Sequence, residues 1–115
     1  MRELFIDFET RSPIDIGEHG LARYLQDVTP LLLAWAIGDD PVVVWDITTG
    51  EPMPAELRDA LVDPTCIVIA HNAAFERGVL EVMGFPIEIE RWRDTAAIAA
   101  SLGLPSDLAT LSRVM

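Results

Sequence analysis

Four short apolar runs constrain the fold of this chain more than any other feature of its sequence. They read LFIDF, LLLAWAIG, VVVWD and CIVIA, at residues 4–8, 31–38, 42–46 and 66–70. Apolar runs of this length, bounded by Gly, Pro and Asp, are typical of buried strands. Three of them precede the first strong helical pattern, so the sequence predicts an α/β fold with a mixed sheet.

The turns between these runs predict how the strands pair. The polar turn Asp39-Asp40-Pro41 separates the second and third runs, which predicts an antiparallel hairpin. The fourth run follows a helical pattern, so we expect its strand to lie parallel to the first. The other elements expected are a short helix at 21–26, helices at 55–62, 73–83 and 95–102, an extended connector at 85–92, and a last helix capped by Ser106 or Asp107.

Composition narrows the class of protein. The chain has 115 residues, half of them hydrophobic, which predicts one domain with a real core. Eight arginines and no lysine stand against 19 acidic residues, a net charge of −11. A protein that coats DNA carries a basic surface, so binding to nucleic acid would have to be local or mediated by a metal.

The single cysteine and the apolar run lengths bear on cellular context. Cys66 lies in an apolar run, which predicts a buried free thiol and excludes an internal disulfide. The first residues do not resemble a signal peptide, and no apolar run approaches the ~20 residues of a membrane span. We therefore expect a cytoplasmic chain with no membrane partner.

The first candidate site is a pair of acids at the end of the first predicted strand. Residues two apart on a strand face the same side, so Asp7 and Glu9 would place two carboxylates together. Like charges held together are unfavourable, and a divalent cation such as Mg²⁺ or Mn²⁺ resolves the repulsion. The alternative is a polar strand end in which Asp7 binds neighbouring backbone.

The second candidate site begins where the fourth strand becomes a helix. Asn72 and Glu76 lie about one helical turn apart, so both can address one site, and the small residues between them leave room for a ligand. The alternative is local, with Asn72 as a helix cap and Glu76 as an ordinary first-turn acid.

Together the two sites resemble a known family. Residues 6–10 (IDFET) and 70–76 (AHNAAFE) resemble the first two motifs of the DEDD (DnaQ-like) 3′–5′ exonucleases. The segments FIDFETRS, HG, AHNAAFER, RWRDT and LGLP are most similar to the exonuclease domain of phage-type family A DNA polymerases. The similarity runs along essentially all 115 residues.

This resemblance implies an RNase H-like mixed sheet flanked by helices, and a two-metal site with Mg²⁺ or Mn²⁺ that removes nucleotides from a DNA 3′ end. Asp7, Glu9 and Glu76 match its acidic catalytic and metal-binding positions, with Glu76 where the family usually has Asp. Thr10, Asn72 and Phe75 match positions at the substrate strand or flanking it, although Phe75 also suits packing.

The third motif of the family, a Tyr or His followed by an Asp, has no match in these residues. Asp94 is expected to cap a helix or to lie at the edge of the site, and Asp107 to cap the last helix. Tyr24 lies too far upstream, and His71 is expected to be structural, with a supporting position beside the site as the alternative. The resemblance therefore implies that residues 1–115 are the N-terminal part of an exonuclease domain, with room for one ion or two. Its partners would be a single-stranded DNA 3′ end and the polymerase or C-terminal remainder of the parent protein, in a bacterial or phage-infected cell. The alternative is an inactive RNase H-like module for binding or homo-oligomerisation.

Weaker candidates are the tryptophans and arginines. Trp35 and Trp45 lie in apolar runs and are expected in or near the core, although tryptophans can also stack on bases. The candidates for contact with phosphate are Arg77, Arg91 and Arg93. The alternative for each of them is a solvated position on the surface.

Overall fold

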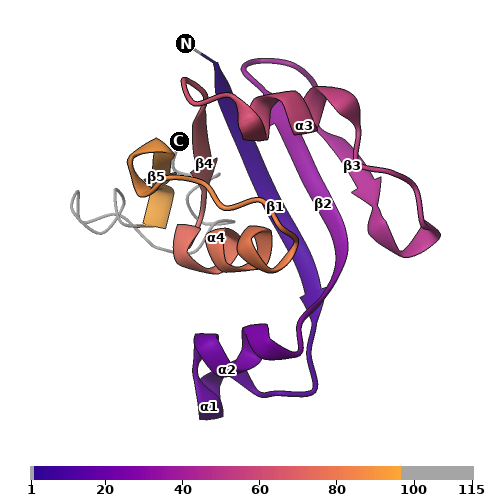
Figure 1. Cartoon of the computed structure of the whole chain (residues 1–115), viewed down its shortest axis with the longest axis vertical. Coiled ribbons are helices and arrows are strands. Elements are labelled where there is room, and N and C mark those ends of the chain that lie inside the picture. The colour runs from indigo at the N-terminus through magenta and orange to yellow at the C-terminus, as the bar shows by residue number, and fades with distance from the viewer. Residues whose placement is uncertain (1, 97–115) are drawn as a thin grey trace.

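The computed structural model describes residues 2–96 of the chain as one mixed sheet with helices (Figure 1). In chain order the elements are β1 (Glu3–Arg11), α1 (Ile16–His19), α2 (Leu21–Gln26), β2 (Thr29–Ile37), β3 (Val43–Asp46), α3 (Ala55–Val62), β4 (Ile67–Ala70), α4 (Ala73–Val82) and β5 (Trp92–Asp94). Short 3₁₀ turns lie at Ile47–Thr49 and Ile89–Arg91. The strand order is β3-β2-β1-β4-β5.

The central strand, β1, has neighbours of opposite direction. It pairs antiparallel with β2, which pairs antiparallel with β3 through the predicted hairpin. On its other side β1 pairs parallel with β4, and β4 pairs parallel with β5. The prediction of an α/β fold with a mixed sheet, in which the fourth strand lies parallel to the first, is confirmed.

The core lies on one face of this sheet. Leu4, Ile6 and Phe8 alternate along β1 toward that face and are buried, because successive strand residues point to opposite sides. Helices α3 and α4 pack there, and they stand in front of the sheet in Figure 1. On the opposite face Phe5 keeps 40% of its surface exposed, and Asp7 and Glu9 are exposed on the same side.

Local patterns predicted most elements closely. The helices predicted at 21–26 and 55–62 have the observed bounds, and the one predicted at 73–83 ends one residue earlier, at Val82. Helix α1, in a segment predicted as loop, was missed, although Asp15 caps it by accepting a hydrogen bond from Gly17 N at 2.9 Å. The helix predicted at 95–102 lies mostly outside the described residues, and the last helix with Ser106 and Asp107 lies wholly outside them.

The sequence predicted an extended connector at 85–92 followed by a capped helix, and it did not predict the strand β5 that the structure has at Trp92–Asp94. Trp92 pairs with Val68 and Asp94 with Ala70, in parallel register. Three residues carry too little periodicity to identify a strand, and this one forms because the edge of β4 offers backbone partners.

Arg91 is a second correction, because it is neither solvated nor available to phosphate. Its side chain is 7% exposed and donates to the carbonyls of Cys66 at 2.9 Å, Leu61 at 2.8 Å and Ala60 at 3.0 Å. Two of these carbonyls belong to the last turn of α3, where carbonyls lack intrahelical partners. Arg91 therefore fastens the end of α3 to the sheet.

The remaining core predictions agree with the structure. Trp35 and Trp45 are each 6% exposed, and Trp92 is 8% exposed. Cys66 is a buried free thiol, as predicted. No helix in the described part of the chain combines the length and apolarity that crossing a bilayer requires.

Candidate functional site

The candidate site lies where β1 extends beyond its parallel neighbour. β4 pairs with β1 only between Glu3 and Phe5, while β1 continues to Arg11. The chain leaves β4 at Ala70, turns through His71 and Asn72, and enters α4 beside the free edge of β1. Ligands of α/β proteins often bind at such a point, where neighbouring connections diverge at the carboxyl ends of strands.

Glu76, in the first turn of α4, fills this gap from the core side. It is 4% exposed, and its Oε2 accepts a hydrogen bond from the backbone N–H of Phe8 at 3.1 Å. The interpretation of Glu76 as an ordinary first-turn acid is therefore wrong. Burial raises the pKa of its carboxyl to about 8, partly opposed by the hydrogen bond from Phe8.

Asp7 and Glu9 flank Phe8 on the opposite side of β1 and are exposed, so the predicted pair on one face is present. Both carboxylates add to the raised pKa of Glu76 by charge repulsion. Within residues 2–96 the Asp7 side chain accepts no hydrogen bond from neighbouring backbone, so the bonding in the alternative interpretation is absent, while an exposed polar strand end still fits both acids.

The three acids have the chemistry of a hard-cation site, because carboxylate oxygens are the ligands that Mg²⁺ and Mn²⁺ prefer. Their electrostatic coupling fits such an ion as well, since a dication would offset the repulsion that acts on Glu76. Across residues 2–96, however, no three His, Cys, Asp or Glu side chains are gathered closely enough to hold a metal ion as they stand.

The turn between β4 and α4 has an unusual backbone. Asn72 has φ 62° and ψ 60°, and no other residue except glycine has positive φ between residues 2 and 96. It occupies the N-cap position of α4 but makes no capping bond with its side chain, so that interpretation is wrong. Asp94 accepts from Asn72 N at 3.0 Å and from Ala73 N at 3.1 Å instead.

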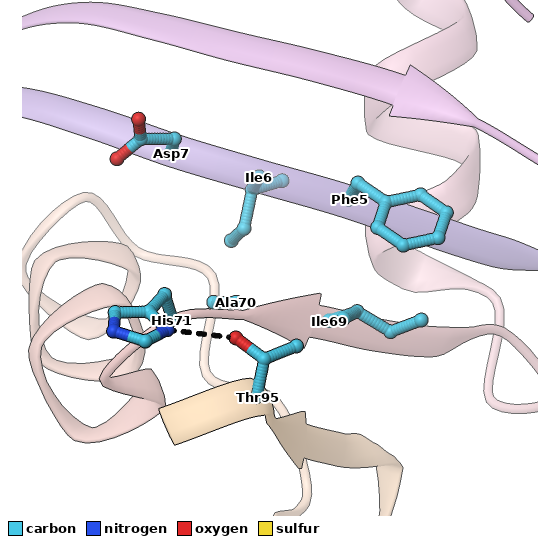
Figure 2. Close-up of a pocket in the computed structure, with 7 residues that line it drawn as sticks. All are labelled: Phe5, Ile6, Asp7, Ile69, Ala70, His71 and Thr95. Atoms are coloured by element: carbon cyan, nitrogen blue, oxygen red, sulfur yellow. Dashed lines mark hydrogen bonds between the residues drawn. The ribbon is translucent and has the colours of Figure 1, made fainter. Parts of the chain in front are cut away.

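Two adjoining cavities surround this turn. The larger, about 440 Å³, is lined by Asp7, Asn72, Phe75 and Glu76 together with Ile16, Leu21, His71 and Ala74. The smaller, about 200 Å³, lies over Phe5, Ile6 and Ile69 on the open face of the sheet. Figure 2 shows Asp7 and His71 beside this smaller cavity, with His71 Nδ1 bonded to Thr95 Oγ1 at 2.9 Å.

The structure therefore gathers four of the six predicted site residues around one cavity: Asp7, Asn72, Phe75 and Glu76. Glu9 and Thr10 line neither of these two cavities. Thr10 lies one step further along β1, and its Oγ1 is 2.8 Å from the hydroxyl of Tyr24 on α2.

Tyr24 and Asp94 are the residues near the site whose contacts sequence reasoning missed. The ring of Tyr24 lies 6.0 Å from the ring of Phe75, so Tyr24 connects α2 both to β1 and to α4. The signal in the sequence for Asp94 was its position before a predicted helix, which indicated a cap. The hydrogen bond that Asp94 accepts from Ala96 N at 2.9 Å agrees with that capping role. Its reach to Asn72 had no local signal.

Comparison with known proteins adds two findings, and no protein-family model matches the chain. The chain is 36% identical over 121 residues to a DNA polymerase of Bacillus phage SP02, a match that covers all of this chain and 18% of the polymerase. The chain thus spans less than a fifth of the length of that relative.

A chain in the structure of the yeast NOT1 MIF4G domain co-crystallized with CAF1 has a similar fold, with a TM-score of 0.50 and 12% identity, over 92% of this chain and 70% of that one. That likeness concerns the fold alone. The similarity to the phage protein supports a DNA polymerase-related origin for this mixed α/β chain.

Proposed function

We propose that the chain forms part of a metal-dependent 3′–5′ exonuclease, of proofreading type and RNase H-like fold, in a DNA polymerase-related protein. The observation that carries the proposal is the buried carboxylate of Glu76, held against Phe8 between the two acids that flank that residue. The similarity to a phage DNA polymerase supports the same context.

The charge arrangement supports a cation site. In the folded chain Glu76 has a pKa of about 8, so without a nearby cation it is mostly protonated at neutral pH. Asp7, Glu9 and Glu76 would hold Mg²⁺ or Mn²⁺, which would supply a nucleophilic water and stabilise the charge of phosphodiester hydrolysis. The backbone N–H of Phe8 keeps the Glu76 carboxylate oriented toward β1.

The cavity supports a nucleic-acid end as the substrate. Asn72 offers an amide and Phe75 an aromatic surface on the same wall, beside the acids. Such groups contact the sugars and bases of a single strand, while the cation overcomes the repulsion between an acidic protein and phosphate. Thr10, bonded to Tyr24, would border the strand at the end of β1.

The test uses the 115-residue chain with a single-stranded DNA labelled so that shortening from the 3′ end is visible. Mn²⁺ binding is followed by calorimetry, and cleavage by gel, with Mg²⁺ or Mn²⁺ present. We expect measurable Mn²⁺ binding and little or no cleavage by this chain alone, because its three acids are fewer than the two-metal chemistry of the resembled family uses. Asp7→Asn should abolish the Mn²⁺ binding, and strong cleavage that Asp7→Asn abolishes would contradict the expected inactivity while supporting the site.

The matched control is Asp63→Asn, which alters a carboxylate that binds Arg2 at 2.8 Å. Asp63 lies before the start of β4, and the β4–α4 turn follows the end of that strand. This variant should bind Mn²⁺ like the unmodified chain. If the unmodified chain does not bind Mn²⁺, or if both variants behave alike, the proposed metal site is wrong.

An inactive module for binding or self-association is the second candidate. It is favoured by apolar side chains exposed around edge strand β3, where Val42 is 68% and Val44 58% exposed. Exposed apolar patches of this kind often mark interfaces. Light scattering on the purified chain tests self-association, and a monomeric mass at high concentration would exclude it.

A further inference from the structure

We propose that Asp94 is a positioning residue for this site: its carboxylate fixes the left-handed turn at Asn72 and thereby aims Asn72 and Glu76 into the cavity. The positioning is a property of the fold, while its consequence for cation binding rests on the proposed function. Asp94 lies in the RWRDT segment, outside the two motifs that contain the predicted site residues.

The geometry begins with strand pairing. Asp94 ends β5 opposite Ala70, the last residue of β4, because the two strands run parallel in register. Its carboxylate therefore reaches the residues that follow Ala70. One oxygen accepts from Asn72 N at 3.0 Å and from Ala96 N at 2.9 Å, and the other accepts from Ala73 N at 3.1 Å.

These contacts hold the backbone at the start of α4. The first N–H groups of a helix lack intrahelical partners, and an anion at that end also interacts favourably with the helix dipole. An Asn at the N-cap normally takes an extended backbone and accepts with its side chain from the N–H two or three residues further on, which here would be that of Ala74 or Phe75. Asn72 is left-handed and makes no such bond, while Asp94 binds the N–H groups of Asn72 itself and of Ala73, the first residue of α4.

The competing conformation is therefore clear. Without the Asp94 carboxylate, Asn72 is expected to leave the left-handed region, which is less favourable than the extended region even for Asn, and to cap α4 with its own side chain. That change would draw the Asn72 amide out of the cavity and turn the first helical turn, on which Glu76 sits. The hydrogen bond from Phe8 to Glu76 would lengthen or break.

A second contact from the same segment supports the role. Thr95, the next residue, bonds His71 at 2.9 Å (Figure 2). The last residue of β5 and the residue after it thus hold the two residues that follow β4. The end of β5 determines the backbone path between the sheet and α4.

The experiment compares Asp94→Ala and Asp94→Asn with the control Asp63→Ala in the 115-residue chain. Asp63 is a fair control because it also accepts from a backbone N–H, that of Thr65 at 2.9 Å, but at the end of β4 opposite to the β4–α4 turn. The main readout is the amide resonance of Phe8 in nitrogen-15 spectra, since it reports the bond to Glu76. The second readout is the dissociation constant for Mn²⁺.

We expect Asp94→Ala to shift the Phe8 resonance and to weaken Mn²⁺ binding about 10-fold or more, the range typical of residues that orient metal ligands. Asp63→Ala should change neither. Asp94→Asn keeps one acceptor oxygen, so its Phe8 resonance and its Mn²⁺ dissociation constant should lie between those of the unmodified chain and of Asp94→Ala. It replaces the alanine variant in the comparison if that variant does not fold.

Adding Asn72→Gly to Asp94→Ala should return the Phe8 resonance toward its original position, because glycine enters the left-handed region freely and cannot cap with a side chain. Loss of stability alone, with an unchanged Phe8 resonance, would reduce Asp94 to a simple cap and overturn the proposal, as would failure of the glycine rescue. If the unmodified chain does not bind Mn²⁺, the proposed function fails while the Phe8 resonance still decides the role of Asp94.

Discussion

The backbone N–H of Phe8 donates to the carboxylate of Glu76 at 3.1 Å, across 68 residues of sequence. This bond joins the central strand to the first turn of α4 at the place where β4 has already ended. It also brings a buried carboxyl close to the charges of Asp7 and Glu9. The first turn of α4 and the two acids on either side of Phe8 are therefore brought close together by this hydrogen bond.

The pH dependence of stability should report the Glu76 carboxyl. Its pKa is about 8 in the folded chain against an ordinary 4.5, so the folded chain holds an extra proton between these pH values. Stability should be fully present below about pH 4.5 and fall as pH rises toward 8. Glu76→Gln removes this loss and should be more stable at pH 8.5 by up to about 5 kcal/mol.

Urea unfolding from pH 5.5 to 9 measures the effect. The control is Glu56→Gln, which changes an exposed acid in the first turn of α3 and should leave the pH profile intact. A wild-type profile that is flat over this range would show that Glu76 ionises normally.

Divalent cations should oppose that loss of stability. At pH 8 the wild-type chain should gain about 2.7 kcal/mol when Mn²⁺ reaches 100 times its dissociation constant, because binding to the folded state alone stabilises it. Asp7→Asn and Glu9→Gln should each reduce this gain. Thermal melting measures it, with NaCl at matched ionic strength as the control, and an equal response to NaCl would contradict specific binding.

Arg91→Lys should destabilise the chain by about 2–4 kcal/mol, because the three buried carbonyls are bound by three separate nitrogens of the guanidinium and a lysine has a single nitrogen. The matched variant is Arg93→Lys, since Arg93 is exposed and, among residues 2–96, bonds the nearby carbonyls of Glu90 and Trp92. Urea midpoints at pH 7 compare the two. Equal losses would mean that the carbonyl contacts of Arg91 contribute little.

Tyr24→Phe should cost about 1 kcal/mol, because it removes the hydroxyl that bonds Thr10 while keeping the ring beside Phe75. Thr10→Val completes a double-mutant cycle. A coupling energy near 0.5–1.5 kcal/mol is expected from equilibrium unfolding. Additive effects of the two substitutions would indicate that the hydroxyls act independently.

Local signals account for what could be predicted. The hairpin of β2 and β3 followed from a polar turn between two apolar runs, and α3 from its apolar spacing after Pro54. The shared face of Asp7 and Glu9 followed from the two-residue period of a strand. The metal ion, the exonuclease activity and the RNase H-like assignment remain predictions that the experiments above address.

The predictions that were wrong concern residues whose partners lie far away in the sequence. Strand β5 is three residues long and owes its existence to the edge of β4, and Arg91 is buried because the end of α3 and the carbonyl of Cys66 meet around it. Asn72 resembled an ordinary helix cap and Glu76 an ordinary first-turn acid, but the carboxylate of Asp94, 22 residues after Asn72, binds the backbone at the start of α4, and Glu76 is buried against Phe8.

The sequence by itself determined most of the strands and helices, though not β5, and that two acids share one face of β1, because those properties depend on residues a few positions apart. Tertiary structure alone decided that Glu76 is buried against Phe8 and that Asp94 holds the turn at Asn72. Buried carboxylates and backbone N–H groups need partners, and here folding supplies them from distant parts of the chain.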